Sequence, residues 1–444
     1  MKKILLLLTG CAFFFTAKAQ VSVTVFEDIL FYDGYAALVD LGTHPVPDGV
    51  IRHRNDLYAK KLSADQLAAF GSNMTINVTI KAACDNYDRI GNVNLAFVPT
   101  GSTAYNPAEV EHIELARFIT PFMNKNIEPT QVPYTFSADN VAKIFKDPAI
   151  LADYDIWVEF EVFGVPYAAQ EQVAGCAGRI DVFYGTLEFV SNADTFSADD
   201  NFLLPMNFKK NLNNYEVGAT DAIGTTERTI VFTAPSDISE ATFVLITSNH
   251  GSNPGGEEYN RRWHRVFYDG ALKLLYKPGG VSCEPYRQYN TQGNGIYGAT
   301  PRTDAEWASF SNWCPGQVIP IRTVPIGDMP AGDHTFKITV AGAQFVGQQG
   351  YIPVSLYLQG NAGELAVDDF DMMSYNLYPN PTENFIAVQS SSAVRHFTVY
   401  NMIGQRMLQG QSAQIDLGGF SKGVYLVEIE FENHRKVTEK VIRK

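Results

Sequence analysis

The sequence lacks several features that would point to common functions. After its N-terminal segment it has no run of about 18 apolar residues, so no membrane-spanning helix is predicted. Neither a Cys-x-x-Cys pair nor a His-Glu-x-x-His motif occurs, which argues against a zinc ribbon, a redox motif or another metal site. A basic balance is also missing, because the formal net charge is −14 and nucleic-acid binding needs a basic surface.

The composition that is present fits a globular β protein. Hydrophobic residues make up 45% and charged residues 18%, which favours a packed fold over disorder. The 29 Phe and 22 Tyr residues favour strands, and the 35 Gly and 22 Pro residues favour tight turns between them. Solubility is sufficient to explain the acidic balance.

The N-terminus has the pattern of an export signal. Lys2 and Lys3, an apolar stretch over residues 4–15 and a small-x-small cleavage site predict a signal peptide over residues 1–19. A Leu-Thr-Gly-Cys sequence that ends at Cys11 leaves a lipoprotein signal open as an alternative, although the apolar run continues past this cysteine.

Removal of the signal peptide leaves four cysteines. An even number in an exported chain predicts two disulfides. Proximity in the sequence favours Cys84 with Cys176 and Cys283 with Cys314, but the sequence alone leaves the connectivity open.

Alternation of apolar and polar residues with period two dominates the chain, and it predicts strands separated by turns. Helical patterns are few, at residues 63–70 and 137–145. We therefore predict an all-β protein with two β-sandwich domains, at 20–191 and 192–360. A polar, acidic linker at 361–374 and a small β unit at 375–444 follow.

Two carboxylate-bearing segments are candidates for chemistry. The loop from Cys84 to Arg89 packs Asp85 and Asp88 beside an arginine and an aromatic residue, although an Asp-Asn turn would look the same. Glu159 and Glu161 share one face of a strand whose other face is apolar. If a second domain covered that face, desolvation would raise their pKa values; the alternative is a solvent-facing strand edge.

A third candidate is the Gly-rich loop from His250 to His264. It carries acids, arginines and aromatic residues, the mixture that sugar sites use for stacking and for hydrogen bonds to hydroxyls. An exposed mobile loop is the alternative, and its histidines could also hold an adventitious ion.

These segments resemble the peptide-N-glycosidase F family. In chain order the matching pieces are Cys84-Asp85, Tyr87-Asp88-Arg89, Ala116 to Pro121, Ile156 to Glu159, Asp181 with Tyr184-Gly185, Glu258 with Arg262 and His264, and Trp313 to Gly316 with Pro320 and Arg322. The resemblance covers about residues 22–360. It implies two eight-stranded antiparallel jelly rolls packed side by side, with the active site in the cleft between them.

The resemblance also implies roles for the matched residues. Asp88 takes the position of the main catalytic acid, and Glu159 and Glu258 those of glutamates that hold water and the glycan core. Cys283 and Cys314 match a family disulfide. The residues that we expect to bind substrate are Tyr87, Arg89, His250, Arg262, His264, Arg302 and Trp313. No metal and no cofactor is expected, and changes such as Phe310 in place of a family arginine leave glycan specificity open.

The last 70 residues or so resemble a type IX secretion sorting domain. The pieces that carry this resemblance are Tyr378-Pro379-Asn380-Pro381, Phe397 to Asn401, Gly404-Gln405, Gly423 to Val427 and the basic end Arg443-Lys444. The resemblance implies export by the type IX machinery, either into the medium or to the outer-membrane surface.

The reaction that these resemblances imply is hydrolysis of the β-aspartylglucosaminyl amide, which releases N-linked glycans from proteins or peptides and converts Asn to Asp. A non-catalytic glycan-binding surface protein on the same fold is the alternative. A copper hydroxylase would need clustered His and Met ligands, and the histidines here are scattered. We expect the protein to act as a monomer.

Overall fold

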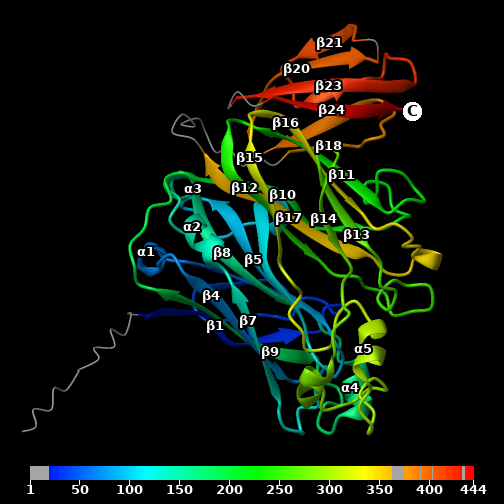
Figure 1. Ribbon diagram of the computed structural model, residues 1–444. Helices are drawn as coiled ribbons and strands as arrows, with labels where there is room; N and C mark the ends of the chain where they lie inside the picture. The colour runs from blue at the N-terminus through cyan, green and yellow to red at the C-terminus, as the bar shows by residue number, and fades with distance from the viewer. Residues whose placement is uncertain (1–19, 363–374, 391, 403, 433–435) are drawn as a thin grey trace, which may run out of the picture.

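The computed structural model describes residues 20–362 and 375–444, apart from residues 391, 403 and 433–435. These residues form six antiparallel sheets in three β units that follow one another through the molecule (Figure 1). The predicted signal peptide lies outside the described residues. So does most of the predicted linker, although strand β17 continues into it as far as Ala362.

The first unit packs a four-stranded sheet, in the order β1-β9-β4-β7, on a five-stranded sheet, in the order β2-β3-β8-β5-β6. That is one strand more than the eight expected. Alternate residues such as Ile76 and Val78 of β4 and Val158 and Phe160 of β8 fill the core between the sheets, because successive side chains of a strand point to opposite faces. The strands are β1 (Gln20–Tyr32), β2 (Val50–Arg54), β3 (Leu57–Lys61), β4 (Met74–Ala82), β5 (Ile90–Pro99), β6 (Glu111–Ile119), β7 (Gln131–Ser137), β8 (Tyr154–Val162) and β9 (Asp181–Asn192).

The second unit packs two four-stranded sheets, in the orders β10-β17-β12-β15 and β11-β16-β13-β14. An Asp269-Gly270 turn joins β13 to β14, and both residues have the positive φ that a two-residue hairpin needs. The strands are β10 (Asn201–Leu212), β11 (Glu227–Ala234), β12 (Ile238–Thr247), β13 (His264–Tyr268), β14 (Ala271–Tyr276), β15 (Arg322–Met329), β16 (Gly332–Thr339) and β17 (Ile352–Ala362).

The third unit has a three-stranded sheet, β18-β19-β22, and a four-stranded sheet, β21-β20-β23-β24, over a small core of its own. Its strands are β18 (Tyr375–Tyr378), β19 (Phe385–Ser390), β20 (Val394–Asn401), β21 (Arg406–Gly410), β22 (Gln414–Asp416), β23 (Gly423–Phe431) and β24 (Lys436–Arg443).

Helices are short. The two predicted helices are present, and Ser63 caps the first of them with a capping box, since its hydroxyl accepts from Gln66 N–H and the Gln66 side chain accepts from Ser63 N–H. The helices are α1 (Ala64–Ala69), η1 (Pro107–Glu109), α2 (Asp139–Ile144), α3 (Pro148–Asp153), α4 (Tyr167–Gln172), η2 (Glu284–Tyr289), α5 (Asp304–Phe310) and η3 (Val346–Gln348).

The first two units meet along β6, the edge strand of the five-stranded sheet. At the end of β6, Ile119 N–H donates to the Gln317 carbonyl (2.9 Å), and Phe118 forms a β-bridge with Val318. The fully buried Arg117 pairs with Glu114 (2.6 Å) and donates to the Pro353 carbonyl of the second unit (2.8 Å). The two units are therefore joined by main-chain and buried polar contacts, and loops of both lie at their common end (Figure 1).

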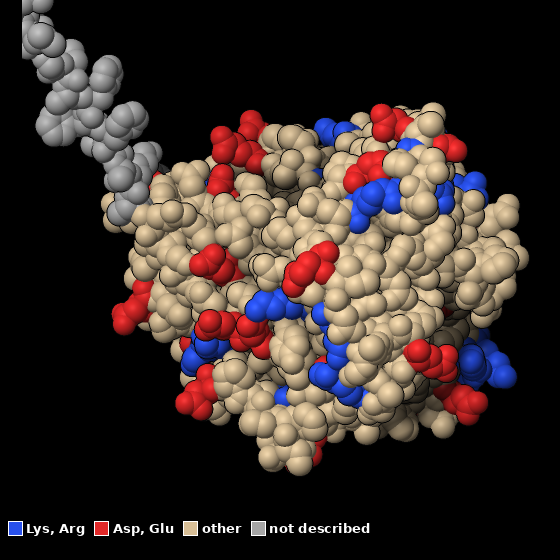
Figure 2. All heavy atoms as spheres, turned by 90° about the horizontal axis from the view of Figure 1, so that it is seen from below, with Lys and Arg blue, Asp and Glu red and all other residues tan. Residues whose placement is uncertain are grey.

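Charge is well mixed on that end of the molecule. Figure 2 views it from below, where Lys and Arg side chains lie among Asp and Glu side chains over a mostly uncharged surface. The net acidity therefore does not form a single patch on this face.

Candidate active site

The loop that carries Asp88 is rigidly held between β4 and β5. A disulfide joins Cys84 at its start to Cys176. The fully buried Asp85 carboxylate accepts from Tyr87 N–H (2.9 Å), from Val165 N–H (2.6 Å) and from Arg89 Nε (2.6 Å). Asp85 therefore organises the loop, and its neighbour Asp88 stays partly exposed at the tip.

The side-chain amide of Asn312 holds the loop that carries Glu258. Asn312 Nδ2 donates to the carbonyls of Glu257 (2.9 Å), Glu258 (2.6 Å) and Asn260 (3.2 Å). A Cβ on Gly256 would lie 2.0 Å from the Gly251 carbonyl oxygen, so only glycine allows this close turn. These hydrogen bonds and this close turn hold the loop, which argues against the alternative of an exposed mobile loop.

The Asp88 and Glu258 carboxyls, one from each unit, share one electrostatic environment. Burial and, after it, the negative charge of Glu258 together raise the pKa of Asp88 to about 7, while Arg89 opposes the change. Burial also raises the pKa of Glu258 to about 7 against a hydrogen bond from Tyr259. Two carboxyls that titrate near pH 7 and repel each other hold about one proton between them at neutral pH.

Aromatic rings surround this acid pair. Tyr259 lies beside Phe310, with ring centroids 5.5 Å apart, and both carboxyls raise the Tyr259 pKa after burial. Arg302, predicted to bind substrate, lies over the rings of Phe310 (4.8 Å) and Trp307 (5.1 Å). Tyr87 faces Phe122, and Arg89 lies over the Tyr87 ring at 5.4 Å. Rings and cations beside acids are what a sugar amide needs for binding.

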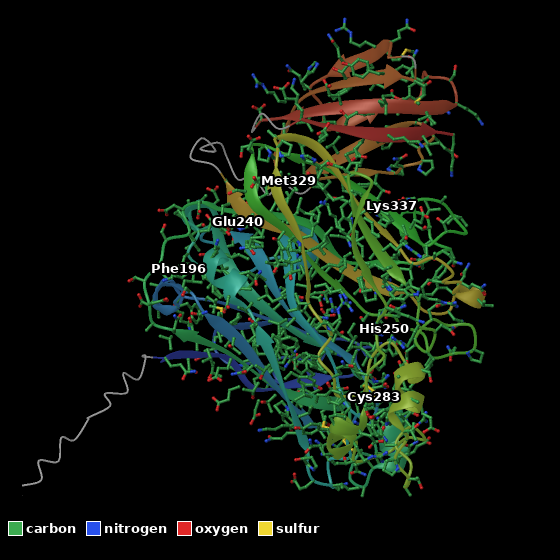
Figure 3. The ribbon with its side chains drawn as sticks, in the orientation of Figure 1. Phe196, Glu240, His250, Cys283, Met329 and Lys337 are labelled. Atoms are coloured by element: carbon green, nitrogen blue, oxygen red, sulfur yellow. A yellow bond between two sulfur atoms is a disulfide. The ribbon has the colours of Figure 1, made fainter. Side chains whose placement is uncertain are left out.

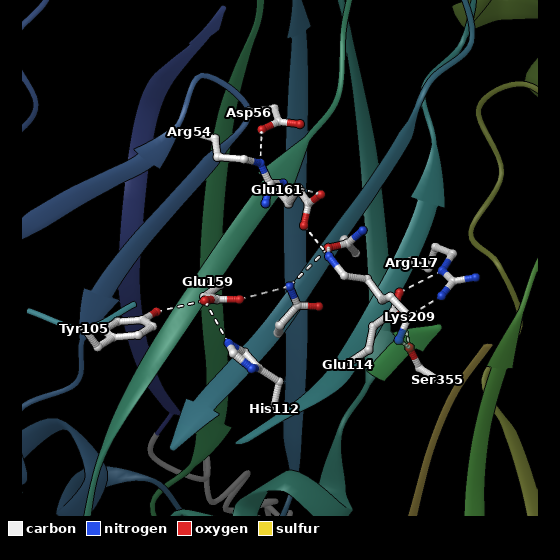
Figure 4. A network of polar contacts seen from close by, with 12 residues as sticks. Arg54, Asp56, Tyr105, His112, Glu114, Arg117, Glu159, Glu161, Lys209 and Ser355 are labelled. Carbon is white, nitrogen blue, oxygen red and sulfur yellow. Dashed lines mark hydrogen bonds and ion pairs between the residues drawn. The ribbon is translucent and has the colours of Figure 1, made fainter. Parts of the chain in front are cut away.

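Glu159 lies in a different place from the acid pair. Its neighbour on β5 is Asn94, which is six residues along the chain from Asp88, a span of at most about 20 Å at the rise of a strand. Glu159 accepts hydrogen bonds from Tyr105 Oη (2.8 Å) and Asn94 Nδ2 (3.4 Å) and contacts His112 Nε2 (3.1 Å), as Figure 4 shows. None of these contacts involves Asp88 or Glu258.

The expectation that burial would raise the Glu159 pKa was wrong. Desolvation does act to raise it, but the hydrogen bonds from His112 and Tyr105 and the charges of His112 and Lys209 lower the pKa of Glu159 to about 2. The solvent-facing alternative was wrong as well, because β8 lies inside its sheet and Glu159 is 1% exposed. Glu159 is a buried, ionised acid.

Three other predicted residues also lie in the packing of the second unit. Trp313 is buried and its indole N–H donates to the Asn249 carbonyl (2.9 Å). His264 is fully buried against Tyr276, and burial lowers its pKa to about 3. Arg262 forms an ion pair with Glu257 (2.8 Å), next to the Glu258 loop.

His250, another predicted substrate-binding residue, packs among aromatic rings of the second unit. Its ring lies against Trp313 and Tyr351, its Nε2 contacts Ser248 Oγ (2.7 Å), and burial lowers its pKa to about 3. Figure 3 labels it together with Cys283, which lies lower, beside α5. Cys283 is joined to Cys314, and with Cys84–Cys176 both predicted disulfides are present. Among the described residues no cluster of three His, Cys, Asp or Glu is arranged to hold a metal ion.

Sequence reasoning missed the residues that act through these acids. Asn312 precedes the Trp-Cys-Pro-Gly stretch of the family resemblance, and Tyr259 follows Glu258 directly, so the sequence offered a signal for both residues. His112 and Tyr105 gave no signal, because nothing in their sequence neighbourhood shows that β6 and the loop before it fold over Glu159.

Models of known families match most of the chain. The N-terminal and C-terminal parts of peptide-N-glycosidase F match residues 22–177 and 219–359, and a secretion system C-terminal sorting domain matches residues 376–444. The sorting domain shows that the protein is exported, as a secreted or cell-surface protein. No curated protein matches the sequence.

Solved structures show the same fold at low identity. PNGF-II is 18% identical with a TM-score of 0.55, and the match covers 78% of this chain and 66% of that chain. PNGase F, a glycosylasparaginase from Flavobacterium meningosepticum, is 12% identical with a TM-score of 0.49, and the match covers 78% of this chain and 96% of that one. The chain thus spans about two thirds of the length of PNGF-II. With both halves of the family matched in order, and an acid from each half meeting at their boundary, the chain belongs to the peptide-N-glycosidase F family.

Proposed function

We propose that this protein hydrolyses the amide bond between an N-linked glycan and its asparagine, with N-glycosylated proteins or peptides as substrates. The observation that carries the proposal is the pair Asp88 and Glu258, two carboxyls from different domains whose pKa values are both raised to about 7. An acid with a pKa near the working pH is suited to proton transfer. Membership of the family supports the substrate class.

The pair supplies the two forms of carboxyl that amide hydrolysis needs. The ionised member accepts a proton from water, whose oxygen then forms a bond to the amide carbonyl carbon. The protonated member gives its proton to the amide nitrogen as the C–N bond breaks, because an amine leaves only when protonated. The products are a peptide with Asp in place of Asn and a glycosylamine, which later loses ammonia.

The neighbouring groups support this chemistry in named ways. Arg89 is fixed by Asp85 and lowers the Asp88 pKa, so its positive charge reaches the acid pair and can offset charge that develops on the carbonyl oxygen. Tyr259 and Phe310 offer rings on which a pyranose can stack. In this proposal Glu159 holds the sheet and the domain boundary in place and does not touch the first sugar.

The test is incubation of one N-glycosylated peptide with the wild-type protein and with Asp88→Asn, followed by mass spectrometry. We expect the wild type to release the glycan and to leave a peptide about one dalton heavier than its Asn form, since Asp replaces Asn. Asp88→Asn should fold and leave the glycopeptide intact. Binding without any mass change by the wild type would instead favour the glycan-binding alternative, and full activity of Asp88→Asn would overturn the assignment.

A further inference from the structure

A cavity of about 120 Å³ is lined in part by Asn312, whose side chain also donates to the Glu258 carbonyl. It is formed where β12 ends, where β15 begins and where the segments 277–281 and 312–320 come together. The polar side chains among its lining residues are those of Thr247, Ser248, Lys277, Asn312, Gln317 and Arg322. No Asp or Glu lines it, so the cavity carries only positive charge in a protein whose net charge is −14.

Neither cation of the cavity is neutralised by an acid. Within the described part of the chain, no salt bridge of 4.0 Å or less joins Arg322 or Lys277 to a carboxylate. Burial lowers the pKa of Arg322, and only Tyr276 opposes this change. Arg322 is partly buried and Lys277 is exposed, so both charges can be reached by an external anion.

The Arg322 side chain is held ready for a ligand. Its guanidinium lies 3.9 Å from the centroid of the Tyr276 ring and donates from one terminal nitrogen to the Pro320 carbonyl (3.1 Å). These contacts fix the plane of the guanidinium, and a fixed planar fork matches a carboxylate.

Asn312 connects the cavity to the loop that carries Glu258. This residue is among those that line the cavity, and its Nδ2 donates to the carbonyls of Glu257 (2.9 Å), Glu258 (2.6 Å) and Asn260 (3.2 Å).

We infer that this cavity is a carboxylate-binding subsite, in which Arg322 and Lys277 hold the anion. Two parts of a glycoprotein carry such a group: an acidic sugar of the glycan, and an Asp or Glu side chain of the peptide near the glycosylated asparagine. Because Asn312 contacts both this cavity and the Glu258 loop, the subsite borders the amidase site. That the ligand belongs to the glycoprotein substrate rests on the proposed function.

The test measures binding rather than turnover. Three fluorescent glycopeptides of one sequence are titrated into the Asp88→Asn full chain: one with a neutral glycan, one with a sialylated glycan, and one with a neutral glycan and an added Asp beside the glycosylated asparagine. We expect one acidic probe to bind about tenfold more tightly than the neutral probe, the value of a hydrogen-bonded charge. Preference for the sialylated probe identifies a sugar acid, and preference for the Asp probe identifies a peptide acid.

Two variants decide whether the cavity is responsible. Lys277→Gln and Arg322→Gln, each in the Asp88→Asn background, should remove the preference and leave binding of the neutral probe unchanged. Lys273→Gln removes an exposed cation four residues from Lys277 and should keep the preference. Arg322→Lys retains the positive charge but lacks the planar guanidinium, so this variant should keep only part of the preference for the acidic probe. A partial loss of this kind indicates changed recognition and not misfolding.

Equal binding of the three probes would overturn the proposed subsite. So would a loss of the acidic preference in Lys273→Gln as large as the loss in Lys277→Gln. Cleavage of the neutral probe by the wild-type protein is measured separately. Absence of cleavage would count against the amidase, whereas a charge preference that depends on Arg322 would still hold.

Discussion

Two sets of acids at the boundary between the first two domains behave in opposite ways. Asp88 and Glu258 have pKa values raised to about 7, whereas Glu159 has a pKa lowered to about 2, although all three suffer desolvation. The difference lies in their partners. Asp88 faces another acid, and Glu159 receives hydrogen bonds from His112 and Tyr105. Burial alone therefore does not decide the charge of a carboxyl; the groups that replace water do.

The largest difference between the two sets of acids is expected in catalytic activity. Glu258→Gln should lower kcat by about a thousandfold, equivalent to about 4 kcal/mol, because the acid pair then loses the member that completes proton transfer. Glu159→Gln should change kcat per folded molecule by less than about threefold. Glycopeptide cleavage, normalised to the folded fraction from circular dichroism, measures both. Equal losses in the two variants would mean that Glu159 also takes part in the chemistry.

The next largest effect is expected in stability. Glu159→Gln should lower the free energy of unfolding by about 3 kcal/mol at pH 7, since it removes the buried charge to which His112 and Tyr105 bind. Urea denaturation measures the change. Glu161→Gln is the matched control on the same face of β8. It has more exposed partners in Arg54 and Lys209 and should cost less.

The acid pair should show the opposite dependence on pH. The folded-state pKa of Asp88 lies above its ordinary value of 3.8, so ionising it destabilises the fold as the pH rises from about 4 to about 7. Asp88→Asn should therefore raise the free energy of unfolding by up to about 4 kcal/mol at pH 8 and leave it nearly unchanged at pH 4. Asp48→Asn, at an exposed site, is the control. A destabilised Asp88→Asn at pH 8 would contradict the raised pKa.

The smallest effect concerns a single hydroxyl. Tyr105→Phe removes the 2.8 Å hydrogen bond to Glu159 and should cost about 1.5 kcal/mol, the lower value for a bond to a charged group. The Glu159 pKa then rises, and because a depressed acid pKa stabilises the fold only above that pKa, acid unfolding should begin at a higher pH. Thermal melts between pH 2 and pH 5 would show this, and an unchanged onset of acid unfolding would assign the low pKa to His112 and Lys209.

Local patterns predicted the architecture well. Alternation marked the strands β4 and β8, and the patterns at residues 63–70 and 137–145 marked two helices, because each pattern depends on neighbours a few residues away. The loop that carries Glu258 was also found locally, since it is dense with polar and aromatic residues. Glu159 was found from the pattern of its strand, yet the groups that set its pKa come from segments as distant as Lys209 of the next domain.

The sequence by itself determined the alternating strands, the acids and the cysteines available to pair, since these follow from residue type and short-range spacing. Tertiary structure decided which acids meet, because β6, β8 and the loops of two domains approach one another only after folding. It also decided their charge, since the free energy of a buried carboxylate depends on whether hydrogen-bond donors or another acid take the place of water.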